Sequence, residues 1–143
     1  MRGRLYIERK EDTPEVILDG EQKQFSIFGM SMPEDSLTFY RPIIHWVEEY
    51  LQQPFDSFCL DIKLLYFNTS SAKELARILA TLYECDQHDK IKVRWYYDHN
   101  DPENLENCMR YELIPLQYEY YEYDFSSLEQ QPDEPEGTYH ILP

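Results

Sequence analysis

The chain has 143 residues, a hydrophobic content of 42% and a formal net charge of −15 at pH 7. This length and an aromatic content of 15% fit one globular domain and exclude a disordered chain. The negative charge repels nucleic-acid backbones and anionic membranes, so we expect neither as a partner.

The N-terminal third predicts a small antiparallel meander, with strands over residues 4–9, 14–19 and 24–30. A helix then begins at Asp35 or Ser36 and closes before Pro54. Its apolar positions recur every three or four residues: Phe39, Ile43, Trp46, Val47, Tyr50 and Leu51. Pro42 lies inside this pattern, which predicts an irregular or kinked first turn or two.

The next strand is expected over residues 55–67, with apolar side chains on both faces. Phe58, Leu60, Ile62 and Leu64 share one face, and Cys59, Leu65 and Phe67 share the other. This pattern indicates a central strand covered by helices on at least one side. A second helix over 71–86 follows, with a buried stripe of Leu75, Ile78, Leu79 and Leu82.

The last third predicts a strand over 91–97, a short helix over 102–112 and a strand region over 114–125. Alternation slips between Tyr120 and Tyr121, as at a β-bulge. The order β-β-β-α-β-α-β-α-β predicts one α/β domain over residues 1–125, a mixed sheet with helices packed on it. Residues 126–143 are polar, acidic and Pro-rich, and we expect a mobile tail.

Three consecutive hydroxyl residues, Thr69, Ser70 and Ser71, stand between the central strand and the second helix. A helix N-terminus exposes N–H groups and favours negative charge, so it suits a phosphate. Simple capping is the alternative explanation, because Ser71-Ala72-Lys73-Glu74 has the capping-box pattern S-x-x-E. One cap needs one hydroxyl, and this leaves Thr69 and Ser70 outside the helix.

Several blocks of the chain, in order, resemble the SiaC family of bacterial regulatory phosphoproteins. They are Pro33-Glu34-Asp35-Ser36, Trp46-Val47-Glu48, Asp61-x-x-Leu64-Leu65-Tyr66-x-Asn68-Thr69-Ser70-Ser71 and Val93-x-Trp95-x-Tyr97-Asp98. The resemblance implies a fold like the STAS domain of anti-sigma-factor antagonists, with Thr69 as the phosphoacceptor. It also implies a partner kinase, a metal-dependent Ser/Thr phosphatase and a diguanylate cyclase that the unphosphorylated protein binds and activates, promoting biofilm formation.

We therefore expect a cytoplasmic, non-enzymatic switch without a cofactor. In this interpretation Thr69 accepts phosphate, Asn68, Ser70 and Ser71 shape the loop and cap the helix, and Lys73 partly neutralises the phosphate. A phosphate on a docking surface repels negative charge on the partner and must lose its hydration when the partner binds. Both effects weaken binding and release the partner.

Two other function classes stay open at this stage. Asp98, His99 and Asp101 could form the site of a small metal-dependent hydrolase, although D-H-N-D-P also fits a turn with an Asp cap. The acidic chain could instead compete with nucleic acid for a nucleic-acid-binding protein. The three cysteines, Cys59, Cys85 and Cys108, form no C-x-x-C pair, so a zinc ribbon or disulfide scaffold is not expected.

The tyrosine-rich strand Tyr118–Tyr123 has two interpretations. It is either a strand packed on one side and solvated on the other, or a partner surface, including a homodimer edge.

Overall fold

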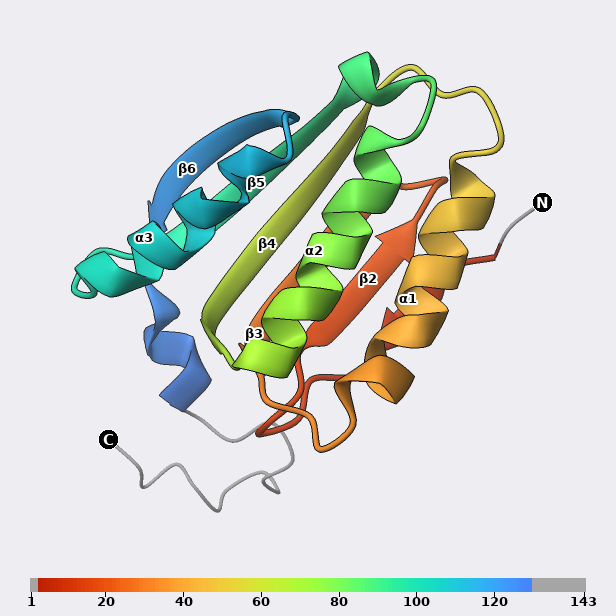
Figure 1. The fold of residues 1–143 in the computed structure, drawn as a ribbon. Helices are drawn as coiled ribbons and strands as arrows, with labels where there is room; N and C mark the ends of the chain where they lie inside the picture. Colours follow the sequence, from red (N-terminus) through yellow and green to blue (C-terminus); the bar gives the residue numbers. More distant parts are fainter. Residues whose placement is uncertain (1–2, 130–143) are drawn as a thin grey trace.

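The computed structural model describes residues 3–129, and its centre is a six-stranded sheet (Figure 1). The strands lie in chain order: β1 (Leu5–Ile7), β2 (Glu15–Asp19), β3 (Gln24–Ser31), β4 (Phe58–Phe67), β5 (Ile91–Asp98) and β6 (Gln117–Tyr123). β1, β2 and β3 pair antiparallel, and β3 to β6 pair parallel. The predicted meander and the mixed sheet are both confirmed.

The helices α1 (Ser36–Tyr50), α2 (Thr69–Tyr83) and α3 (Pro102–Met109) cover one face of this sheet (Figure 1). Three short 3-10 helices, η1 (His88–Lys90), η2 (Arg110–Leu113) and η3 (Phe125–Glu129), complete the described elements. Each of the helices α1, α2 and α3 lies in the connection between two neighbouring parallel strands, as the predicted order of elements requires. The described part of the chain, residues 3–129, contains no helix that is long and apolar enough to cross a bilayer.

The core lies between the helices and the sheet. It is formed by the apolar residues that recur at every second position of the strands and at every third or fourth position of the helices. On β4 the even-numbered residues Phe58 to Leu64 are 2% exposed or less, whereas their odd-numbered neighbours are half-buried. The predicted apolar stripe of α2 is fully buried, at 1% exposure or less. The opposite face of the sheet carries no helix among the described elements, and we call it the open face.

The structure differs from the local predictions at several places. α1 continues through Pro42 to Tyr50, and α2 begins at Thr69 rather than at residue 71. α3 ends at Met109 and passes into η2. β6 pairs with β5 in unbroken register, so the predicted bulge at Tyr120 and Tyr121 is absent. Residues 125–129 form η3, and the rest of the predicted tail lies outside the described residues.

The register shift occurs instead between β3 and β4. Gly29 pairs with Leu64 and Met30 with Tyr66, which leaves Leu65 as the extra residue. Gly29 has a φ of 135°, a conformation that side chains rarely adopt. The bulge reverses the facing of the strand end, so Phe67 contacts Trp95 and Tyr111 on the helix side, with ring centroids 6.3 Å apart in both pairs. The prediction that Phe67 faces the other way was therefore wrong.

Candidate functional site

The hydroxyl cluster lies at the edge where the parallel strands end and α1 and α2 begin (Figure 1). The chain leaves β4 at Phe67, and Asn68 connects directly to α2. The Asn68 N–H donates to the carbonyl of Ser31, the last residue of β3, at 3.0 Å. This short connection places three hydroxyl residues in the first turn of a 15-residue helix.

Asn68, not Ser71, is the N-cap of α2. Its side-chain Oδ1 accepts from the Ser71 N–H at 2.9 Å, and its carbonyl accepts from the Ala72 N–H at 2.9 Å. The predicted capping box at Ser71 is therefore wrong, because Asn68 supplies the cap three residues earlier in the chain. The N–H groups of Thr69 and Ser70 are the other donors of this first turn and point out from the helix end.

Ser71 is fully buried in a network of hydroxyl groups. Its Oγ donates to the Ser31 carbonyl at 3.0 Å and lies 2.8 Å from the Ser31 Oγ, which in turn lies 2.6 Å from the Tyr40 hydroxyl. Since Ser71 has one hydroxyl proton and gives it to the carbonyl, Ser31 donates to Ser71 and Tyr40 donates to Ser31. Burial raises the pKa of Tyr40 to about 12, which keeps this donor protonated.

Ser70 is exposed, but its hydroxyl is occupied. Its Oγ lies 2.7 Å from the Oγ of Ser36, the first residue of α1, and donates to the Asn68 Oδ1 at 3.2 Å. These contacts join the N-termini of α1 and α2. On the α1 side, Asp35 caps the helix by accepting from the Thr38 N–H at 3.1 Å, as the sequence predicted for Asp35 or Ser36.

Thr69 is the exposed hydroxyl without such ties. It is the first residue of α2, and among residues 3–129 its hydroxyl makes no hydrogen bond. Lys73 is also exposed and follows at i+4, the spacing that places two side chains on one side of a helix. The structure thus brings Thr69, Ser70, Ser71, Asn68 and Lys73 to one helix end, with a different environment for each hydroxyl.

The sequence reasoning missed four supporting residues. Ser31, Tyr40 and Ser36 hold the loop from β3 and α1, and Tyr111 donates from its hydroxyl to the Ala72 carbonyl at 2.9 Å. Ser31, Ser36 and Tyr111 lie more than 30 residues from their partners in the loop, and Tyr40 acts through Ser31. The sequence marks these residues in one way: each carries a polar group at a position where the hydrophobic pattern predicts the core or the start of a helix.

The bulge before the site is held by Asn104, which is 4% exposed. Its amide nitrogen donates to the carbonyls of Leu64 and Leu65 at 3.3 and 3.2 Å, and its oxygen accepts from the Asp98 N–H at 2.9 Å. Asn104 therefore satisfies backbone groups that the irregular strand end leaves without ladder partners.

The alternative site at Asp98, His99 and Asp101 is a turn followed by a helix cap. Asp98 Oδ1 accepts from the Asn100 N–H at 3.1 Å, and Asp101 Oδ1 caps α3 by accepting from the Glu103 N–H at 3.1 Å. No group of three or more His, Cys, Asp or Glu side chains within residues 3–129 is arranged to hold a metal ion. The carboxylates do what the turn interpretation predicts.

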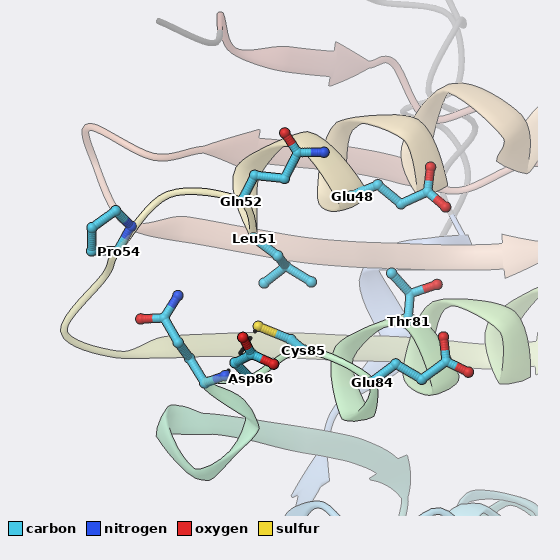
Figure 2. A pocket seen from close by; sticks show the side chains of 9 residues that line it. Glu48, Leu51, Gln52, Pro54, Thr81, Glu84, Cys85 and Asp86 are labelled. Atoms are coloured by element: carbon cyan, nitrogen blue, oxygen red, sulfur yellow. Dashed lines mark hydrogen bonds between the residues drawn. The ribbon is translucent and has the colours of Figure 1, made fainter.

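A hollow of about 800 Å³ lies at the other end of the helices, between the C-terminal turns of α1 and α2 (Figure 2). Glu48 and Leu51 line it from α1, and Thr81, Glu84 and Cys85 line it from the α2 side. Its charged lining is acidic and faces two helix C-termini, so it disfavours a phosphate.

The tyrosines of β6 divide between the two faces of the sheet. Tyr118 packs against the core, and its hydroxyl donates to the Ile114 carbonyl at 2.6 Å, whereas Tyr121 is 42% exposed on the open face. Burial raises the pKa of Tyr118 to about 12. Asp61 accepts from Arg94 Nε at 2.6 Å and does not reach the phosphosite loop.

Comparison with known proteins agrees with this geometry. The family model described as "SiaC family regulatory phosphoprotein" matches residues 7–118. An uncharacterized protein of Pseudomonas aeruginosa (strain UCBPP-PA14) is 38% identical over 98 residues, which are 66% of this chain and 75% of that protein.

Solved structures of similar proteins come from the same species. SiaC of Pseudomonas aeruginosa matches with a TM-score of 0.76 and 30% identity, over 85% of this chain and 99% of that one. SiaC in complex with the diguanylate cyclase SiaD, which it activates, matches with a TM-score of 0.77 and 30% identity, over 83% and 99%. Apo-SiaC matches with a TM-score of 0.74 and 31% identity, over 83% and 98%.

Proposed function

Because the chain belongs to the SiaC family of regulatory phosphoproteins, we propose that it is a switch that phosphorylation of Thr69 turns off. The unphosphorylated form binds a partner enzyme and activates it, and the phosphorylated form releases it. The partner is a diguanylate cyclase, by analogy with SiaC of Pseudomonas aeruginosa, which is the activator of the cyclase SiaD. The chain itself then catalyses no reaction and works in the cytoplasm within c-di-GMP signalling.

The observation that carries this proposal is the difference among the three hydroxyls. Ser71 is sealed in the buried network, and Ser70 bonds to Ser36 and Asn68. Thr69 is exposed, and its hydroxyl makes no hydrogen bond within the described part of the chain. A kinase can therefore reach the Thr69 oxygen without unfolding the helix end, and a metal-dependent Ser/Thr phosphatase can reach the phosphate.

The surroundings of Thr69 favour a phosphate locally. The N–H groups of the first turn and the positive end of the α2 dipole face it, and Lys73 lies one turn further along. A phosphate at this position adds about 1.5 to 2 negative charges at pH 7. The helix therefore tolerates the modification, so that its main effect falls on whatever docks there.

Two large apolar side chains flank the phosphosite. Leu37 follows Ser36 and is 50% exposed, and Tyr66 precedes Asn68 by two residues and is 49% exposed. In this proposal the partner docks across the start of α2, so that docking desolvates the position of Thr69. Burying an unpaired charge in an interface can cost several kcal/mol, and each 1.4 kcal/mol lowers affinity about tenfold. One phosphate is thus enough to release the partner.

The test combines site mapping with variants. Mass spectrometry of the chain isolated from its own cells is expected to find phosphate on Thr69. Thr69→Ala is expected to stay bound to the cyclase when kinase and ATP are present, and Thr69→Asp to bind weakly. Ser70→Ala is the matched control, because it removes the neighbouring hydroxyl and leaves the switch intact. Phosphate found only on other residues would overturn the proposal.

A further inference from the structure

The open face of the sheet carries a cluster of aromatic rings and cations at the end where η3 begins. We define this open-face cluster as Phe28, Lys63, Tyr96, Tyr121 and Tyr123. The Tyr96 ring stacks on Tyr121 with centroids 5.4 Å apart, and Tyr123 meets Tyr96 edge-on at 5.9 Å and Phe28 edge-on at 6.2 Å. The helices α1, α2 and α3 lie on the opposite face of the sheet (Figure 1), and η3 reaches the cluster at Tyr123 through Phe125.

One cation, Lys63, lies within this cluster. Lys63 Nζ lies 4.8 Å from the Tyr96 ring centroid and 5.2 Å from that of Tyr123, and it forms no salt bridge within residues 3–129. The Arg9 guanidinium lies 5.7 Å from the Phe28 ring centroid. The nearby cations Arg94 and Lys92 are paired with Asp61 and Glu119. The cluster therefore offers one cation, Lys63, held among aromatic rings, a setting that suits a carboxylate.

The chain leaves the described structure beside this cluster. Phe125, the first residue of η3, is 5% exposed and meets the Tyr123 ring edge-on, with centroids 4.8 Å apart. This contact places the start of η3 at the open face. The C-terminal segment, residues 130–143, has fourteen residues. Fourteen residues reach about 46 Å when extended, whereas six strands span about 24 Å, so the segment is long enough to cross the sheet.

The composition of residues 130–143 complements the cluster. The segment contains Asp133, Glu134 and Glu136, no lysine or arginine, and the apolar or aromatic side chains Tyr139, Ile141 and Leu142. We propose that this segment docks on the open-face cluster of its own chain, with its carboxylates at Lys63 and its apolar end on the tyrosine rings. A tether this short gives a millimolar effective concentration, so weak contacts suffice.

The docking has a functional consequence. The C-terminal segment covers an aromatic surface that otherwise invites other partners. The proposal is independent of the switch at Thr69, which lies on α2 on the helix side of the sheet.

Zero-length carbodiimide coupling of the full-length chain tests the proposal, because the reagent joins a lysine amine to a carboxylate only when the two are in contact. Peptide mass spectrometry is expected to find Lys63 coupled to Asp133, Glu134 or Glu136 as the main product of this segment. Lys63→Arg keeps the positive charge but cannot couple, so it is expected to remove this product. A mixture of ¹⁴N- and ¹⁵N-labelled chains shows whether the two ends belong to one molecule.

Three outcomes would overturn the proposal. Coupling of the segment mainly to Lys73 would place it at the phosphosite. Coupling spread evenly over the lysines would mean that it has no preferred site. Products that join ¹⁴N and ¹⁵N chains would make a second copy the occupant of the open face.

A second measurement uses the NMR resonances of backbone amides instead of chemical coupling. Substituting Asp133→Asn, Glu134→Gln and Glu136→Gln together is expected to shift the amide resonances of Lys63 and Tyr123. The matched control removes three acidic side chains at the distant hollow, with Glu48→Gln, Glu84→Gln and Asp86→Asn, and is expected to leave these resonances unchanged. Resonances unaffected by the first set would refute the docking.

Discussion

Replacing Ser71 by alanine separates the buried, structural hydroxyl of the loop from the exposed hydroxyl of Thr69, the proposed phosphoacceptor. The Ser71 Oγ accepts from Ser31 and donates to the Ser31 carbonyl, and all of these groups are buried. Its loss leaves the Ser31 hydroxyl without its acceptor, which costs about 1–3 kcal/mol. The better helix propensity of alanine returns about 0.5 kcal/mol. We expect a net loss of about 0.5–2.5 kcal/mol in the free energy of unfolding.

Thr69→Ala is the matched variant in the same turn. Thr69 is exposed and its hydroxyl makes no hydrogen bond within residues 3–129, so the change is expected to stay within about 0.5 kcal/mol. Urea unfolding followed by circular dichroism measures both variants. With a slope of about 2 kcal/mol per M, Ser71→Ala lowers the midpoint by about 0.25–1.25 M, and Thr69→Ala leaves it nearly unchanged. Equal midpoints for the two variants would refute the assignment of separate roles.

Three further predictions concern the supports of the site. Asn68→Ala is expected to lower the free energy of unfolding by about 1 kcal/mol through the lost cap, and an unchanged urea midpoint would return the capping role to Ser71. Asn104→Ala is expected to cost about 1–3 kcal/mol in the same assay, because the Leu64 and Leu65 carbonyls lose a buried donor; a neutral result would mean that water replaces the amide. The hydrogen bond from the Thr38 side chain is the main cause that lowers the pKa of Asp35 below 3.8, so its stabilisation is present above that pH and is lost as the pH falls through the lowered value. Asp35→Asn keeps the cap acceptor and is expected to remove this part of the acid dependence, and an unchanged acid-unfolding curve would contradict the assignment.

The sequence was sufficient to predict the order of elements and most of the core. Buried side chains at every second position of β4, and at every third or fourth position of α2, are signals that local periodicity carries on its own. The tyrosine-rich strand lacked that signal, because aromatic residues occupy both of its faces. A false bulge was predicted there, whereas β6 keeps its register.

The details of the phosphosite depend on contacts between distant segments. Asn68 and Ser71 are both good cap residues, and the choice between them follows from the burial of Ser71 against Ser31 and Tyr40. Likewise, Phe67 changes face because Gly29 and Asn104 accommodate and hold a bulge, and both lie more than 30 residues away along the chain. Local order predicted that Thr69 and Ser70 are both exposed, and the choice of Thr69 between them came from the resemblance to the SiaC family.

Calorimetric titration of the cognate diguanylate cyclase with the full-length chain, carrying phosphothreonine at position 69 or unmodified threonine, tests the central claim most directly. The switch at Thr69 predicts that the phosphorylated chain binds at least about tenfold more weakly, a difference of about 1.4 kcal/mol or more. Equal affinity of the two forms would contradict it.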